Sequence, residues 1–385
     1  MSLSVDFDST MDIRTGTFCI VEAEVDDDEG GSARMTWGVG VIGAGPGVAA
    51  LHLPTLERLR ELFSVVHVAD NGGGRAAELA ARVGATASQG AAELLADPAV
   101  DVVAICSPPG EHARQIREAI AAGKRAILCE KPLATSEAEA EEVVDACRRA
   151  GVVLFVATNH LYDEAWDRAK RHLVALQSEV RSISATVALP PNGRFHELVT
   201  EFPVMPAAPG AGGGRGAPDL ADPEVAASVV RQLVVGLAVH DLPAVRDLAP
   251  DLEGVDFAAA LAPIGYTVGF RSSGIPVLLT AVMLPDGPDP VWRLSIATAI
   301  DRVDVDFPPA FVHAGSAVVR VRGGDVRETT YRRDAEDGYA REWRALAALL
   351  DGTATTEYHE ILDDARFAIV LADAAADAVR RGVAA

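Results

Sequence analysis

Trp37-Gly-Val-Gly-Val-Ile-Gly-Ala-Gly-Pro-Gly47 is the stretch of this chain that decides its fold. A short apolar run leads directly into a glycine-dense turn, and a helical pattern follows it. This order predicts a strand, a turn and a helix whose N-terminal N–H groups can bind a nucleotide pyrophosphate. The candidate binding residues are Gly43, Gly45 and Gly47, although Val48 stands where the usual spacing has a third glycine.

A second motif, Cys129-Glu-Lys-Pro-Leu133, ends another apolar run with an acid, a lysine and a proline. In a parallel α/β sheet, ligands bind at the carboxyl ends of the strands, so we expect both motifs to face one crevice. A lysine beside a dinucleotide site indicates proton transfer coupled to hydride transfer. Two alternatives stay open here: glycine-rich turns also occur in methyltransferases and as structural turns, and a lysine at a strand end can simply be solvated.

Length and composition narrow the class of protein. The 385 residues predict two domains, and the net charge of −22 argues against nucleic acid or an anionic membrane as a partner. The four cysteines and nine histidines lack the spacing of metal ligands, so we expect free thiols and no metal. The chain shows no long apolar run and no signal-like N-terminus, which predicts a cytoplasmic protein.

Alternating apolar runs and helical stretches predict a Rossmann dinucleotide-binding domain, a parallel sheet with crossover helices, in residues 37–158. The expected strands are 37–43, 64–70, 102–106, 126–130 and 152–156. A capping pattern, Ser136-x-x-Glu139, marks the start of the helix between the last two strands. Residues 1–36 differ, because their acidic run 26–29 and the glycines after it are typical of a solvated extension or linker.

Beyond the first domain, strands follow one another without intervening helices, which predicts a predominantly antiparallel open β-sheet over 159–338. The fold class is therefore α/β plus α+β. The expected elements are a helix over 162–176 and strands over 181–189, 262–271, 275–284, 291–300, 317–322 and 326–331. Residues 339–385 fit two amphipathic helices that return to brace the first domain.

A long segment rich in Pro, Gly and Ala, residues 190–227, interrupts the second domain. Such a segment in a compact domain is either disordered or a functional loop, so a lid over the crevice is one interpretation. Arg194, His196 and Arg215 would then contact substrate, and otherwise they are solvated side chains.

Asp70 bears on the choice of nucleotide, because it ends the second predicted strand. A carboxylate there can accept hydrogen bonds from an adenosine ribose and repels a 2′-phosphate, which favours NAD over NADP. The same residue can instead form a turn before the glycines at 72–74, and Arg75 offers a phosphate partner that would favour NADP.

Three more segments follow in order: Ala104-Ile-Cys-Ser-Pro-Pro-Gly-Glu-His112, Ala121-Ala-Gly-Lys-Arg-Ala-Ile-Leu-Cys-Glu-Lys-Pro-Leu-Ala134 and Asn159-His-Leu-Tyr162. Together with the glycine turn, they resemble the Gfo/Idh/MocA family, the group of glucose-fructose oxidoreductase and inositol dehydrogenase. The likeness runs from about residue 37 to the C-terminus and is strongest over 37–172. It implies NAD or NADP as the cofactor.

The resemblance also assigns site residues. Those it implies for cofactor binding, beside the glycines, are Ser107, Pro108, His112, Glu130, Lys131, Pro132 and Asn159. Glu130 is expected to shape the ribose and nicotinamide end of the site. Lys131 is expected between cofactor and substrate, where it can bind a substrate hydroxyl and lower its pKa or relay a proton. His112 opens a helix, a position that suits capping or packing better than catalysis.

Val235-Gly-Leu-Ala-Val-His-Asp-Leu242 resembles the family's helix with Asp-x-x-x-His, whose two side chains share one helix face. The histidine maps to His240, a candidate catalytic acid or base, with a packing role as the alternative. The acid does not map, because Gly236 stands in its place. Asp241 is expected to point elsewhere on the helix, so the usual set of lysine, aspartate and histidine is incomplete.

The leading hypothesis is an NAD(P)-dependent oxidoreductase that interconverts a secondary alcohol and a ketone on a sugar, cyclitol or related polyol. His240 would exchange the hydroxyl proton, and Lys131 would stabilise the alkoxide-like oxygen. The polyol is implied by the resemblance alone, as is a homo-dimer or tetramer formed through the second sheet. The alternative is a cofactor-binding protein of the same family without catalysis, a sensor or assembly partner, which Gly236 favours.

Overall fold

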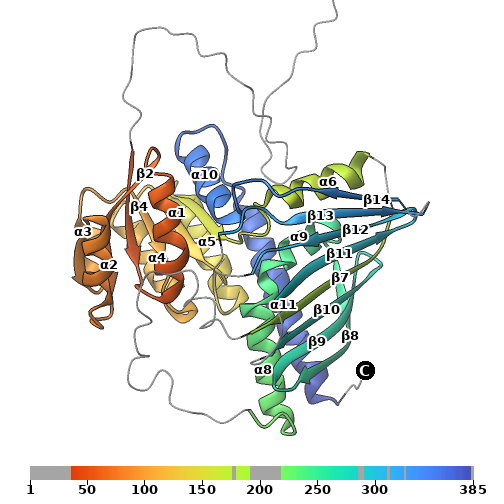
Figure 1. Ribbon diagram of the computed structural model, residues 1–385. Helices are drawn as coiled ribbons and strands as arrows, with labels where there is room; N and C mark the ends of the chain where they lie inside the picture. The colour runs from red at the N-terminus through yellow and green to blue at the C-terminus, as the bar shows by residue number, and fades with distance from the viewer. Residues whose placement is uncertain are drawn as a thin grey trace, which may run out of the picture.

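The computed structural model describes residues 36–175, 179–190, 218–284, 290–309, 313–324 and 327–382. The predicted extension 1–36 lies almost wholly outside the described residues, as do the candidate lid residues Arg194, His196 and Arg215. The described chain forms two sheets with helices packed on them, and the first sheet lies to one side of the second (Figure 1).

The first sheet has six parallel strands in the order β3-β2-β1-β4-β5-β6. They are β1 (Trp37–Ile42), β2 (Phe63–Asp70), β3 (Thr86–Gln89), β4 (Val102–Ile105), β5 (Ala126–Glu130) and β6 (Val153–Ala157). This arrangement confirms the predicted Rossmann sheet. Strand β3 was not predicted, because its four residues are polar or small and mostly exposed. The order reverses between β1 and β4, which is where such a sheet binds ligands.

Crossover helices connect these strands. They are α1 (Leu53–Arg58), α2 (Arg75–Val83), α3 (Ala92–Ala96), α4 (His112–Ala121) and α5 (Glu137–Ala150), and a π-helical turn, Val48–His52, leads into α1. The predicted cap of α5 is present, since the Ser136 side chain accepts a hydrogen bond from the Glu139 N–H. The Glu139 carboxylate does not return to Ser136 but accepts from Thr135, so only half of a capping box forms.

The second sheet has eight strands in the order β14-β13-β12-β11-β7-β10-β9-β8. They are β7 (Val180–Leu189), β8 (Leu252–Leu261), β9 (Ile264–Ser272), β10 (Ile275–Met283), β11 (Val291–Thr298), β12 (Asp301–Asp306), β13 (Val318–Gly323) and β14 (Glu328–Tyr331). All neighbours are antiparallel except β7 and β10, which confirms a predominantly antiparallel sheet. Strands β8 and β12 were not predicted: acids alternate with the buried valines of β12 and hide its apolar pattern.

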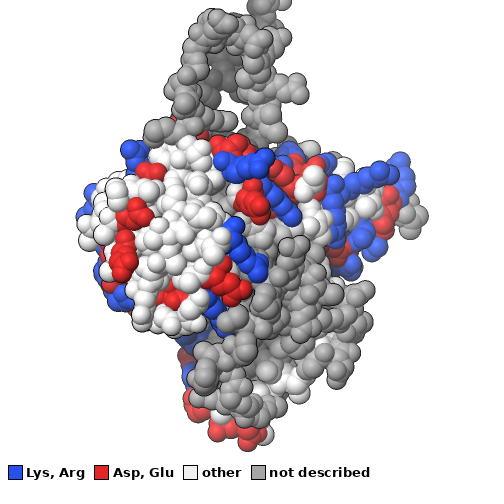
Figure 2. Space-filling view, turned by 60° about the vertical axis from the view of Figure 1, so that its left-hand side comes forward, with Lys and Arg blue, Asp and Glu red and all other residues white. Residues whose placement is uncertain are grey.

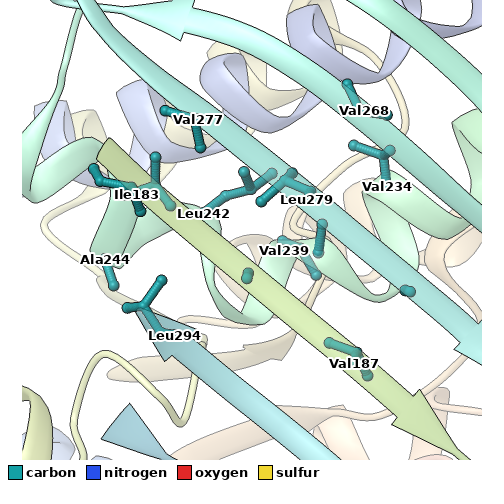
Figure 3. Packing of buried hydrophobic residues seen from close by; sticks show 14 of the residues in the cluster. Ile183, Val187, Val234, Val239, Leu242, Ala244, Val268, Val277, Leu279 and Leu294 are labelled. Carbon is teal, nitrogen blue, oxygen red and sulfur yellow. The ribbon is translucent and has the colours of Figure 1, made fainter. Parts of the chain in front are cut away.

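Helices cover one face of this second sheet. They are α6 (Glu164–Ala175), α8 (Pro223–Gly236), α9 (Leu242–Leu248) and α11 (Tyr358–Arg380), and Figure 1 shows α8 and α11 running along the sheet. Ile183 and Leu279 project from the strands toward Val239 and Leu242 on the helical side (Figure 3). This layer of branched apolar side chains holds the segment 236–242 in a fixed position beside the first domain.

The C-terminal helices connect the two parts. Helix α10 (Gly338–Leu350) packs on α1 and β6 of the first domain, whereas α11 contacts both α5 and α8. Trp343 of α10 is fully buried, with its ring edge-on to Phe63 at 5.1 Å and to His52 at 6.0 Å. Both C-terminal helices thus contact the first domain, and α11 also packs on α8 of the second.

Trp343→Ala is expected to lower the free energy of unfolding by about 3–5 kcal/mol, because it leaves a cavity where a fully enclosed ring was. Urea unfolding followed by far-UV circular dichroism measures this change. Trp343→Phe is the matched control, since it keeps an aromatic ring against Phe63 and should cost less. A loss below about 1 kcal/mol for the alanine variant would contradict the inferred role of this side chain.

The last features of the fold are the charges on its surface and the apolar composition of its helices. Acidic and basic side chains are interspersed over the face seen in Figure 2. Some pair across strands of the second sheet, as Arg293 of β11 does with Asp306 of β12 at 2.5 Å. Within the described ranges, no single helix is long and apolar enough to cross a membrane. One pair of helices, residues 223–240 and 242–248, reaches that length and apolar composition when the two are counted together, and they are bent by 69° relative to each other.

Candidate functional site

A crevice of about 390 Å³ lies between the carboxyl ends of the first sheet's strands and the segment that joins α8 to α9. Several of the predicted site residues line it together: Gly45, Gly47, Ser107, Glu130, Lys131, Asn159 and His240. Their elements are far apart in sequence, and the parallel sheet brings them to one edge.

The glycine turn forms one wall of the crevice. Gly43 has a φ of +111°, and a Cβ atom there would lie 2.6 Å from the Cys106 carbonyl oxygen, so the position requires glycine. A Cβ atom on Gly45, by contrast, would meet nothing within 4 Å, because this residue faces open space. The wall is therefore bare backbone beside a helix start, which fits the pyrophosphate of a dinucleotide.

Asp70 lies at the end of β2 as predicted, but its carboxylate is used locally. One oxygen accepts the Gly72 N–H at 2.7 Å, and the other accepts the Ala76 N–H at 2.9 Å. Asp70 therefore shapes the turn between β2 and α2, and these two bonds carry no preference for NAD over NADP.

Lys131 crosses the crevice toward α8. The Lys131–Pro132 peptide bond is cis. The Lys131 Nζ atom donates a hydrogen bond to the Gly236 carbonyl oxygen at 2.9 Å. Burial lowers the pKa of Lys131, and the nearby Glu130 carboxylate opposes this only in part. A backbone carbonyl thus holds the amine where the family pattern has an aspartate.

The Glu130 carboxylate is shared between two partners, and its Oε2 atom accepts the Lys131 N–H at 3.2 Å. Its Oε1 atom lies 2.9 Å from Nε2 of His52, a buried residue on the π-helical turn. Although burial alone would raise the pKa of Glu130, the contact with His52 lowers it overall. Trp343 donates from Nε1 to the other ring nitrogen of His52 at 3.4 Å. The first domain and α10 thereby fix Glu130 in its ionised form.

His240 lies on a short 3₁₀ turn, Ala238–His240, between α8 and α9. The sequence placed Gly236 within a helix, whereas α8 ends at this residue. Nδ1 of His240 lies 2.8 Å from Oδ1 of Asn159. Because an amide oxygen only accepts, Nδ1 carries the proton and Nε2 has the free lone pair. Burial, followed by the charge of Lys131, lowers the pKa of His240 well below its usual value.

Asp241 points away from His240, as expected. Its carboxylate is buried, where it accepts from Nδ1 of His160 at 2.9 Å and from Nε1 of Trp292. Sequence reasoning missed His160 and Trp292 as neighbours of the site. His160 directly follows Asn159 in the quoted Asn-His-Leu-Tyr segment, which was the one available signal.

Of the cofactor residues that the resemblance implies beside the glycines, three stand outside the crevice lining. His112 is fully buried behind it, with its ring nitrogens 2.8 Å from the Pro132 carbonyl oxygen and 2.9 Å from that of Ser107. It joins the loops that carry Ser107 and Lys131, which is the packing role that the sequence favoured. Pro108 and Pro132 support the same loops without lining the crevice. Among the described residues, no group of three or more metal-binding side chains is present.

Residues 37–158 match the family model GFO_IDH_MocA, described as an oxidoreductase family with an NAD-binding Rossmann fold. The chain is 35% identical over 188 residues to a 1,5-anhydro-D-fructose reductase of Ensifer adhaerens, a match that covers 48% of this chain and 46% of the relative. It is 29% identical over 135 residues to a myo-inositol 2-dehydrogenase of Thermotoga maritima, covering 34% and 39%. The matches thus span less than half the length of these relatives.

Solved structures show the same fold over most of the chain. KijD10, a 3-ketoreductase from Actinomadura kijaniata solved with NADP, has a TM-score of 0.65 at 24% identity, covering 90% of this chain and 98% of that one. The UDP-N-acetylglucosamine 3-dehydrogenase GnnA from Acidithiobacillus ferrooxidans has a TM-score of 0.66 at 19% identity, covering 90% and 99%. At these identities the likeness concerns the fold alone.

Proposed function

We propose that the chain is an oxidoreductase of the Gfo/Idh/MocA family and that it interconverts a secondary alcohol and a ketone on a sugar, cyclitol or related polyol, with NAD(P) as the cofactor. One observation carries the proposal: the Lys131 amine and the His240 ring line the same crevice as the glycine turn. A proton-exchanging pair therefore lies beside the place suited to a dinucleotide.

Lys131, His240 and Asn159 each have a separate role in the proposed reaction. When bound, the nicotinamide supplies the acceptor or donor of hydride. The Lys131 ammonium group donates a hydrogen bond to the substrate oxygen and stabilises negative charge on it. His240 accepts the hydroxyl proton at Nε2 during oxidation and returns it during reduction. Asn159 holds the ring in the tautomer that this step needs.

Gly236 supports a second candidate, a cofactor-binding sensor or assembly partner without catalysis. The chain lacks the carboxylate of the family pattern, and a Cβ atom at 236 would meet nothing within 4 Å. The contact between Lys131 and the Gly236 carbonyl favours the enzyme, because it keeps the amine in position without that carboxylate.

Titration with NADH and NADPH, followed by nucleotide fluorescence, is the first test, and a screen of polyols for turnover is the second. Binding and turnover together support the enzyme. Binding without turnover of any polyol favours the sensor, and binding of neither nucleotide rejects both. Lys131→Ala is the control that separates binding from chemistry.

NAD is the proposed cofactor, because the Asp70 charge lies at the strand end where a 2′-phosphate would approach. Asp70→Asn removes this charge and retains an oxygen that can accept the Gly72 N–H. We expect the ratio of the NADH and NADPH dissociation constants to move toward NADPH by about tenfold. An unchanged ratio in the two fluorescence titrations would show that Asp70 only forms the turn.

The remaining parts of the proposal concern assembly and location. We propose a homo-oligomer that uses the face of the second sheet opposite the helices, where Leu278 is 42% exposed between the buried Val277 and Leu279. Cytoplasmic location and a small-molecule polyol as the partner complete the proposal.

A further inference from the structure

A second, smaller cavity lies next to His240. It has a volume of about 20 Å³ and shares Asn159, His240, Trp292 and Tyr339 with the large crevice. This volume is enough for one water-sized group. The shared walls make it an extension of the crevice, close to the ring proposed to exchange the proton.

His160 forms a wall of this cavity and is held rigidly. The side chain is only 4% exposed, and its ring stacks on Phe307 with centroids 3.6 Å apart and planes 6° from parallel. Trp292 packs edge-on against it at 4.7 Å. A ring fixed on two sides can recognise a ligand atom without losing conformational freedom.

The hydrogen bonding of His160 leaves one nitrogen for the cavity. Its Nδ1 lies 2.9 Å from Asp241 Oδ1, and a carboxylate only accepts, so Nδ1 carries a proton. Asp241 does not line the cavity, so the opposite ring edge, with Nε2, faces it. Within the described residues, Nε2 has no hydrogen-bond partner.

The other polar groups on the walls are already engaged by the chain. Asp163 accepts the backbone N–H groups of Ala165 and Ala317, and Asp337 accepts from Ala340 and pairs with His313. Two carboxylates disfavour an anion here, and the volume excludes a larger group. A neutral hydroxyl, which can donate to Nε2, fits these conditions best.

We propose that this cavity is a subsite for one substrate hydroxyl and that His160 determines specificity by accepting a hydrogen bond from it. This inference rests on the proposed function, because it makes the ligand of the crevice a polyol with a second hydroxyl near the reacting carbon. An analogue that lacks this hydroxyl leaves Nε2 unpaired, which is why the subsite discriminates.

The test uses the full chain saturated with NADH or NADPH, whichever binds, so that an added alcohol cannot react. Isothermal titration calorimetry measures the dissociation constants of myo-inositol and D-glucose and of the monodeoxy analogues of each. For the parent that binds, we expect one analogue to bind about tenfold or more weakly in the wild-type protein. In His160→Asn, which can still donate to Asp241, that difference should vanish while the differences at other positions remain.

His172→Phe is the matched control, since it removes another histidine bonded to an aspartate, half-buried, at 2.6 Å from Asp301 and outside both cavities. It should leave every difference unchanged. His160→Phe, which keeps the stacking on Phe307, is the second variant if the asparagine protein does not fold. Equal weakening of parent and analogues, an unchanged difference, or no binding of either parent would overturn the subsite.

Turnover with the oxidised nucleotide is measured in parallel to separate the two proposals. Discrimination that depends on His160 without turnover rejects the alcohol oxidation but keeps the subsite. Turnover without any discrimination rejects the subsite and keeps the oxidoreductase.

Discussion

Replacement of Lys131 by methionine is expected to lower kcat for polyol oxidation by about 10³-fold, while the protein folds and still binds the dinucleotide. Methionine keeps much of the side-chain volume but removes the amine that donates to the Gly236 carbonyl. The substrate oxygen then loses both its hydrogen-bond donor and the positive charge that stabilises it as the proton leaves. Steady-state kinetics with the best polyol and a parallel nucleotide titration measure the two effects.

The pH dependence of the reaction gives an independent check on Lys131. Burial lowers the pKa of this amine, so the activity that needs its charge should decline at alkaline pH before the ordinary range of lysine is reached. Gly236→Asp adds a carboxylate beside the Nζ atom, which favours the charged amine. We expect this variant to shift the alkaline limb of kcat/KM to higher pH.

Two results would contradict this role of Lys131. One is a methionine variant that retains more than about a tenth of the wild-type kcat. The other is an alkaline limb that stays in place in both Lys131→Met and Gly236→Asp. Lys131→Arg separates charge from proton exchange, because guanidinium keeps its charge over this pH range.

The crevice itself could be predicted from the sequence. The glycine turn after Trp37 and the Glu-Lys-Pro motif each follow an apolar run, and the parallel topology places such strand ends at one edge. Both motifs are local in the sequence. The rule that ligands bind at the carboxyl ends of parallel strands places them at one site. The pairing of His240 with the crevice came from the family pattern, since nothing in its immediate neighbourhood specifies a site.

The polar contacts inside the crevice could not be predicted in this way. Lys131 and Gly236 are 105 residues apart, and His160 and Asp241 are 81 residues apart, so no local pattern connects them. Their meeting depends on how α8 ends and on how the two sheets pack. Asp70 shows the opposite case, because a position typical of ribose binding also suits a turn, and sequence alone does not separate the two.

His240→Gln is expected to reduce kcat for oxidation by about 10²–10³-fold and to remove the acid limb of the pH profile. Glutamine retains a side chain that can bond to Asn159 but has no basic nitrogen. Burial, followed by the charge of Lys131, lowers the pKa of His240, so the ring is neutral and able to accept a proton at pH 7. Oxidation by the wild-type protein should therefore continue below pH 6.5 and fall only as the ring becomes protonated.

Asn159→Asp tests whether this ring is the group that limits the rate. A carboxylate in place of the amide favours the imidazolium form, which raises the pKa of His240 and should move the acid limb to higher pH. The limb should be absent in the double variant with His240→Gln, whatever stands at position 159. A limb that survives in the double variant would mean that another group accepts the proton, and His240 would then be left with the packing role that the sequence kept open.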